Sequence, residues 1–111
     1  MDRTQLLKGV LDLAVLGVIG HSDAYGYDVV RQLRDAGLAE VADASVYGTL
    51  QRLYANGQLS TYQVASDAGP TRKYYALNAA GRTALRDGQQ TWRSVVDAVD
   101  RLLEAPNGAR V

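Results

Sequence analysis

The stretch DASVYGTLQRLYANGQL, from Asp43 to Leu59, decides the fold that we expect for this chain. Val46, Leu50 and Leu53 recur within it at intervals of four and three residues, so they share one face of a helix. An apolar stripe of this kind needs a core to cover it. The stretch therefore predicts a helix that packs on one side.

Residues at the two ends of the stretch are typical of helix boundaries. Asp43 and Ser45 carry side-chain oxygens that can accept hydrogen bonds from free amides at a helix start. Gly57 supplies the left-handed residue that commonly ends a helix. We therefore expect about three helical turns between them.

The opposite face of this helix is polar and almost free of acid. Gln and Arg can bond bidentately to base edges and phosphates, and small neighbours leave room for that approach. This composition favours a nucleic-acid contact, and the alternative is an ordinary solvated face. The residues concerned are Ser45, Tyr47, Gly48, Gln51 and Arg52.

The length and charge of the chain fit one small domain with a local contact surface. With 111 residues the chain can bury one core, and its zero net charge argues against a nonspecific polyanion binder. Between residues 45 and 77, however, Arg52, Arg72 and Lys73 outnumber Asp67. The small positive surplus therefore lies where we expect the contact surface.

The composition excludes several kinds of chemistry. There is no cysteine and a single histidine, so thiolate catalysis, disulfides and cysteine-ligated zinc are excluded, and we expect neither a metal nor a cofactor. No candidate general base or nucleophile remains, so we do not expect an enzyme. The most apolar run, Leu6 to Ile19, is too short to span a bilayer. We expect a cytoplasmic protein with no membrane contact.

The expected first helix, from Gln5 to Ile19, is apolar on two sides. One domain of this size can cover one face, so the other is expected to meet a second subunit, with Gly9 and Gly17 allowing close backbone approach. The alternative is that both faces are filled within one subunit. The two stripes are Leu7, Leu11, Ala14 and Val18, and Leu6, Val10, Leu13 and Gly17.

The elements around the central stretch follow a helix-turn-helix order. A second helix is expected from Gly26 to Ala36, ended by Gly37, and a connector of residues 38–44 leads into the helix described first. Beyond Gly57 the apolar period changes to two, which predicts strands over residues 58–64 and 71–77 with a turn of about six residues. Arg72 and Lys73 would lie near the tip of this hairpin as a basic wing.

A long helix is expected at the end of the chain, capped by Asn78 and running from Ala79 to Glu104. Its second half has a heptad-like stripe that favours a partner helix, although packing back on its own domain is the alternative. We therefore divide the chain into a winged helix-turn-helix domain (residues 1–77), a dimerisation helix (78–105) and a disordered tail (106–111). The stripe comprises Trp92, Val95, Val99 and Leu102, widened by Val96 and Leu103.

Three segments in this order resemble the PadR family of bacterial transcriptional regulators, in its short form. They are AYGYDVVRQL from residue 24, SVYGTLQRLYANGQL from residue 45, and RKYYALNAAGRTAL from residue 72. The resemblance implies a mainly α fold with a β-hairpin wing. It also implies a homodimer through the first and last helices, and repression by operator binding that a small molecule relieves.

The resemblance also assigns roles to residues. Tyr47 and Arg52 match the recognition-helix motif, Arg72 and Lys73 match the basic wing, and Trp92 matches a tryptophan that lines a pore between subunits in some members. Position 48, often proline in the family, is glycine here. A winged-helix module that binds only protein is the alternative to a DNA-binding regulator.

A dimer with two such helices would read a pseudo-palindromic double-stranded operator through successive major grooves. We expect Tyr47, Gln51 and Arg52 to read bases, with Gly48 allowing close approach. Phosphates would be bound by the wing and by free amides near Ala44 and Ser45. The alternative for Tyr47 is a hydroxyl that only holds the helix in place.

A ligand site is expected where the apolar stripes of two subunits meet. Trp92 beside three valines would offer a flat surface to a small planar apolar effector. The alternative is that Trp92 only seals the contact. The residues expected in this interface are Leu7, Leu11, Trp92, Val95, Val96, Val99 and Leu102.

Overall fold

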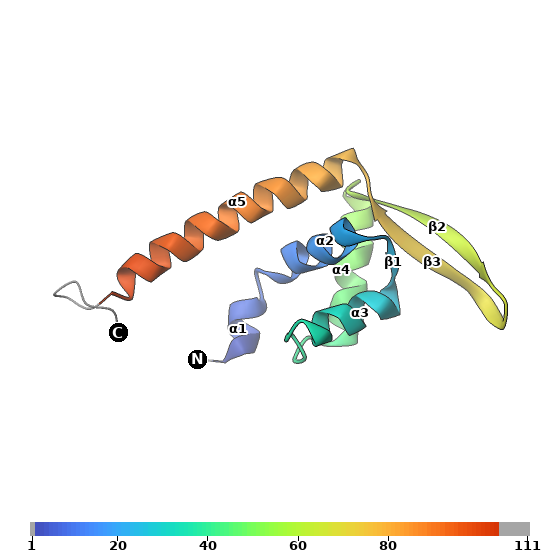
Figure 1. Ribbon diagram of the computed structural model, residues 1–111, viewed down its shortest axis with the longest axis horizontal. Coiled ribbons are helices and arrows are strands. Elements are labelled where there is room, and N and C mark those ends of the chain that lie inside the picture. The colour runs from blue at the N-terminus through green and yellow to red at the C-terminus, as the bar shows by residue number, and fades with distance from the viewer. Residues whose placement is uncertain (1, 105–111) are drawn as a thin grey trace.

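The computed structural model describes residues 2–104, and the expected tail at residues 106–111 lies outside them. The described chain is mainly helical with one small antiparallel sheet, as expected (Figure 1). Its elements in order are α1 (Arg3–Leu7), α2 (Leu11–His21), β1 (Ala24–Tyr25), α3 (Gly26–Asp35), α4 (Asp43–Ala55), β2 (Leu59–Ser66), β3 (Gly69–Leu77) and α5 (Ala79–Leu102).

The core forms where α2 meets the helices α3, α4 and α5 and strand β3. Val46, Leu50 and Leu53 of α4 are buried together with Val15 of α2, which confirms the stripe predicted for α4. The buried set is completed by Leu16, Ile19, Ala24, Val29, Val30, Leu33 and Leu59.

Two glycines end helices in the way the sequence predicts. Gly37 and Gly57 have positive φ angles of 108° and 79°. Beyond them, the Leu38 amide donates to the Leu33 carbonyl and the Gln58 amide donates to the Leu53 carbonyl, which satisfies carbonyls at the helix ends. These caps fix where α3 and α4 stop, and therefore how the chain enters the connector and the wing.

The start of α4 differs from the prediction. Ala42, rather than Asp43 or Ser45, is the N-cap residue, and no side chain caps the helix. Asp43 lies in the first turn and forms an ion pair with Arg34 of α3. The Ser45 amide donates to the Ala42 carbonyl at 3.1 Å, so it is not the free amide that we expected. An acid in the first turn favours the helix through its dipole instead of through a cap.

The single helix expected from Gln5 to Ile19 is wrong. The chain breaks between Leu7 and Leu11, and Gly9 lies in the turn, where its low helix propensity is no cost. Arg3 fixes the direction of α1, because its guanidinium donates to Glu40 at 2.9 Å and to the Gly37 carbonyl at 2.8 Å. The hydrogen bond from Arg3 lowers the pKa of the Glu40 carboxyl. The two continuous stripes therefore do not lie on one helix.

The sheet contains one strand more than expected. Residues 24–25, for which we expected no strand, form β1, and the strand order is β1-β3-β2. Ala24 pairs with Tyr75, so the short strand ties the start of α3 to the hairpin. A two-residue strand has no period that a sequence can display.

The hairpin is longer than predicted. β2 and β3 run to Ser66 and Gly69, which leaves two residues between the strands in place of the expected six. Arg72 pairs with Val64 and Lys73 with Gln63, so both cations lie along the strand and not at the tip. Tyr75 and Leu77 pack against the core.

Helix α5 confirms its predicted start and then leaves the core. The Asn78 side chain accepts from the Gly81 amide at 2.9 Å. Ala84 and Leu85 pack against the core, whereas the second half of the helix runs away from the rest of the molecule (Figure 1). The radius of gyration is 16.8 Å, against about 13 Å for a compact domain of 100 residues. The elongated shape follows from the projecting helix and hairpin.

Gly81 is required by close packing of α5 against the end of α4. A Cβ atom there would lie 2.1 Å from the Gln58 carbonyl oxygen, which is backbone and cannot turn away. We predict that Gly81→Ala lowers the free energy of unfolding by about 1–3 kcal/mol in urea denaturation, since overpacking costs that much.

Gly48→Ala is the matched control, because Gly48 is also helical and nothing lies within 4 Å of its Cβ position. It should raise the free energy of unfolding by about 0.5–1 kcal/mol through helix propensity. Equal effects of the two substitutions would contradict the close approach at Gly81.

Candidate nucleic-acid interface and apolar pocket

The outward face of α4 presents Tyr47, Gly48, Gln51 and Tyr54 to solvent. The burial pattern separates this face cleanly from the core side, which also includes the buried Thr49. Tyr54 was not singled out from the sequence. Its spacing of three residues from Gln51 and seven from Tyr47 could have identified it as a member of the same face.

The Tyr47 ring packs against the start of α3. A Cβ atom on the buried Gly26 would lie 2.3 Å from Tyr47 Cε1, so only glycine leaves room for the ring. Tyr47 as a whole residue is nevertheless 46% exposed. The Tyr47 ring is therefore packed against Gly26 on one side while part of the residue remains exposed to solvent.

Lys73 brings the wing onto the same surface as α4. Its Nζ lies 5.8 Å from the ring centroid of Tyr54 and 5.6 Å from that of Tyr75. A depression of about 270 Å³ lies between the helix and the wing, lined by Tyr47, Gln51, Tyr54, Lys73 and Tyr75. A cation over aromatic rings keeps its charge, so this depression combines hydrogen-bonding groups with a positive centre.

Arg72 lies on the other face of the sheet. Its guanidinium carbon is 4.8 Å from the ring centroid of Tyr25, and Tyr74 lies against both Tyr25 and Tyr62 at centroid distances of 5.5 and 5.6 Å. Alternation along the strand separates Arg72 from Lys73. The two cations of the wing therefore cannot bind the same partner from the same side.

Tyr25, Tyr74 and Tyr62 form a tyrosine row, and a hydrogen bond fixes the Tyr62 end of this row. The Tyr62 hydroxyl donates to Asp23 Oδ2 at 2.6 Å. That bond raises the pKa of the Tyr62 phenol above its ordinary value, with desolvation as a further cause. Because Asp23 directly precedes β1, the bond ties the hairpin to the segment that enters α3.

Arg52 lies on a flank of α4 and is engaged by a carboxylate of α2. Its Nη1 and Nη2 donate to the two carboxylate oxygens of Asp12 at 2.6 and 2.9 Å. This hydrogen bond raises the pKa of the guanidinium further above its ordinary value. The structure therefore does not bring Arg52 together with Tyr47 and Gln51, with which the sequence had grouped it.

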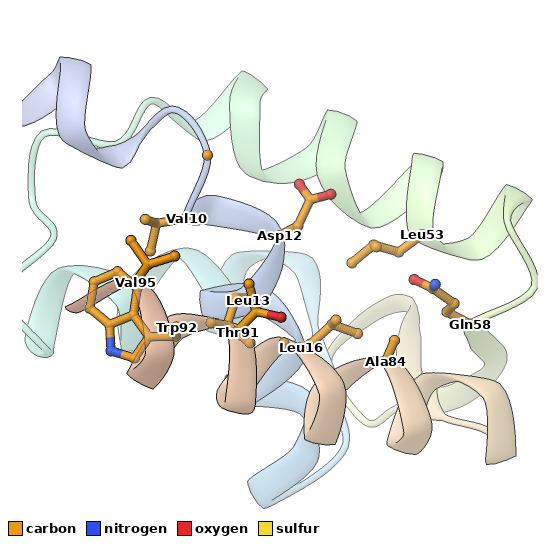
Figure 2. Close-up of a pocket in the computed structure, with 12 residues that line it drawn as sticks. Val10, Asp12, Leu13, Leu16, Leu53, Gln58, Ala84, Thr91, Trp92 and Val95 are labelled. Carbon is orange, nitrogen blue, oxygen red and sulfur yellow. The ribbon is translucent and has the colours of Figure 1, made fainter. Parts of the chain in front are cut away.

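A pocket of about 480 Å³ separates the start of α2 from α5 (Figure 2). Leu13 and Leu16 contribute from α2, and Thr91, Trp92 and Val95 contribute from α5. Trp92 is 47% exposed and Val95 is 52% exposed. Among the described residues that line this pocket, Asp12 alone carries a formal charge.

The remaining residues of the expected interface lie mostly on the same open side of α5. Val99 and Leu102 are exposed and Val96 is partly covered, while Leu7 and Leu11 are half-buried. Leu11 packs against the core of its own subunit. The apolar stripe of α5 is therefore only partly covered within the described chain.

Among residues 2–104 no cluster of three or more His, Cys, Asp or Glu side chains could hold a metal ion. Within that same range no helix has the length and apolarity needed to cross a membrane.

Comparison with known proteins assigns the fold. Residues 15–87 match the model of the transcriptional regulator PadR-like family, which covers well over half of the chain. The chain belongs to the PadR-like family. Its members are transcription regulators and not enzymes, and the fold shared with them is a winged helix.

Several relatives match nearly the whole PadR-like chain. A PadR-like regulator from Bacillus cereus is 34% identical with a TM-score of 0.82, covering 91% of this chain and 98% of its own. A Streptococcus transcriptional regulator is 36% identical with a TM-score of 0.80, covering 88% and 96%. An uncharacterised protein from Lysinibacillus sphaericus is 27% identical over 94% of this chain and 97% of its own.

A more distant structure shares the fold alone. Bacillus subtilis PadR, solved in complex with operator DNA, is 22% identical with a TM-score of 0.64. The alignment covers 73% of this chain and 46% of that protein. The regulators that match nearly the whole chain therefore describe its full architecture better.

Proposed function

We propose that this PadR-like protein is a homodimeric, sequence-specific DNA-binding regulator, acting as a repressor that a small apolar ligand releases. The observation that carries DNA binding is the shared surface of α4 and the wing, where Lys73 lies beside Tyr54 and the depression continues to Tyr47 and Gln51. Hydroxyl and amide groups on the exposed face of α4, beside the ammonium group of Lys73 on the wing, match base edges and phosphates. The proposed place of action is the cytoplasm, where chromosomal DNA is accessible.

Within this proposal the residues have separate tasks. Tyr47, Gln51 and Tyr54 would contact base edges, and Gly48 would allow the backbone to approach closely, since it carries no side chain. Lys73 would bind phosphate beside α4, and Arg72, on the other face of the wing, would make a weaker phosphate contact. Ser45, exposed in the first turn of α4, would add a hydroxyl contact.

Lys73 and Arg72 allow a matched test. We predict that Lys73→Gln lowers the slope of log affinity against log salt by about one unit, because one phosphate contact is lost. Arg72→Gln should lower it less, because its guanidinium lies over Tyr25 on the other face of the sheet. The measurement is a fluorescence-anisotropy titration of the DNA upstream of the coding sequence at several salt concentrations.

Two results would contradict this part of the proposal. Equal loss of slope in both variants would mean that the wing inserts edge-on and that the two faces are equivalent. Absence of binding by the unaltered protein at low salt would favour a winged-helix module that binds only protein.

Dimerisation is proposed from the largely exposed stripe of α5. A 24-residue helix is about 36 Å long, and Trp92, Val95, Val99 and Leu102 follow its open side. An exposed apolar stripe of this regularity marks an interaction surface. In this proposal residues 1–77 form the DNA-binding domain and the first half of α5 packs against it. The rest of α5 joins the subunits and spaces two copies of α4 over a pseudo-palindromic operator.

Val99→Asp should weaken the dimer at least tenfold, because it places a charge in the proposed contact. Light scattering should give twice the chain mass of 12.0 kDa for the unaltered protein and the single mass for the variant. Ser94→Asp is the control, since it adds the same carboxylate to the opposite side of α5. A monomeric unaltered protein at micromolar concentration would refute the dimer.

The effector is proposed to bind in the pocket beside Trp92. Its lining is mostly apolar and its volume of about 480 Å³ lies within the range of small-molecule sites. Trp92, the only tryptophan in the chain, could stack on a planar ligand. Different affinity for the DNA-bound and free forms of the dimer would then shift operator binding.

Trp92 fluorescence tests this proposal directly. We predict that a neutral planar dye such as Nile red quenches it saturably at micromolar concentration and weakens operator binding in the same concentration range. A linear response without saturation would mean that Trp92 only seals the contact between subunits.

A further inference from the structure

The interaction between Asp12 and Arg52 joins two helices with different tasks. Asp12 lies on α2, which is buried in the core, and Arg52 lies on α4, which carries the proposed DNA-reading face. Figure 2 shows the Asp12 carboxylate at the edge of the pocket, pointing toward α4. Both terminal nitrogens of Arg52 are used, at 2.6 and 2.9 Å.

This bidentate geometry is the one by which a guanidinium also binds phosphate. A carboxylate that holds both terminal nitrogens therefore occupies the groups that a phosphate would need. The carboxylate also offsets the positive charge of Arg52. A cation must keep its charge to bind phosphate and release counterions from DNA. Arg52 therefore remains positively charged, but its pairing with Asp12 weakens its attraction for a nearby polyanion.

Arg34 and Lys73, two other cations near α4, have different surroundings from each other. Arg34 is paired with Asp43 in the first turn of the helix. Lys73 contacts only tyrosine rings among the interactions found in the described residues, and aromatic rings leave its charge in place. Of the two flanks of α4, the wing side therefore carries available positive charge and the α2 side carries masked charge.

The Asp12–Arg52 pair is accessible to solvent. The Arg52 side chain is 52% exposed and the Asp12 side chain is 47% exposed, and ion pairs at such positions contribute little to stability. The chain does not need this pair to fold, so its removal is expected to change binding more than stability. Arg52 lies five residues after Tyr47, on a flank that a long side chain could turn toward the DNA backbone.

We propose that Asp12 masks Arg52: the carboxylate retains the guanidinium when DNA binds, and so sets the electrostatic attraction of the α2-side flank of α4 to DNA. Asp12 is thus a positioning residue that keeps one cation out of the phosphate contacts. The inference rests on the proposed DNA binding. It adds that the strength of that binding is limited by an acid outside the reading face.

Four proteins test the masking in the same salt titration: the unaltered protein, Arg52→Gln, Asp12→Asn and the double variant. Arg52→Gln should leave the slope of log affinity against log salt unchanged, in contrast with Lys73→Gln. Asp12→Asn should increase the slope by about one unit, which is roughly a threefold greater loss of affinity over a fourfold rise in salt. The double variant should return to the unaltered slope, because the released cation is then absent.

The double variant separates release of Arg52 from direct repulsion of DNA by the Asp12 carboxylate. If Asp12→Asn and the double variant have the same increased slope, the change comes from loss of the carboxylate itself, whether or not Arg52 is present, and the masking is wrong. A loss of about one unit in Arg52→Gln alone would also overturn it, because Arg52 would then already bind phosphate. Thermal unfolding followed by circular dichroism should give melting temperatures within a few degrees for all four proteins.

Retention on immobilised heparin, a sulfated polyanion, provides a readout that needs no operator. Asp12→Asn should elute at higher salt than the other three proteins. If this order holds while no form binds the upstream DNA, the masking stands and the DNA-binding proposal fails. If all four elute together, the masking is wrong even where the DNA-binding proposal succeeds.

Discussion

Burial of the apolar stripe of α4 against α2 is the interaction on which the rest of this PadR-like structure depends. Leu50 and Val46 are almost completely buried, and they meet Val15, which has no exposed surface. Because α2 also packs against α3, α5 and β3, rotation of α4 about its axis would disturb every other contact of the core. The orientation of the polar face of α4 is therefore fixed by packing on its other side.

Two further contacts hold the hairpin in place beside the helices. β1 pairs with β3 directly before α3 begins, so the hairpin cannot move without the helix-turn-helix unit. Tyr62 and Asp23 add a second tie at the edge of the sheet. Lys73 then faces α4 while Arg72 faces the tyrosine row, and this separation by alternation distinguishes two cations that are adjacent in the chain.

The two halves of helix α5 lie in different environments. Gly81 allows the first turn to approach the carbonyl of Gln58, and Leu85 anchors the next turns on the core. From Trp92 onward the apolar side chains are mostly exposed in the described chain, although their spacing is as regular as that of a buried stripe. An anchored first half and an exposed second half suit a helix that holds its own domain while it reaches a second one, as the dimer proposal requires.

The sequence by itself determined the order of the main elements, the buried stripe of α4, the glycines that end α3 and α4, and the cap of α5. Each depends on local periodicity or on a single residue type, and such signals are complete within a short stretch. Only the tertiary structure decided where the N-terminal helix breaks, that β1 exists, that Tyr47 packs on Gly26, and that Asp12 binds Arg52. These features join residues far apart in the chain, 40 positions for Asp12 and Arg52, and Ala24 of β1 pairs with Tyr75 of β3 over a still longer separation. Whether two distant residues meet depends on the packing of the whole core, which no local pattern encodes.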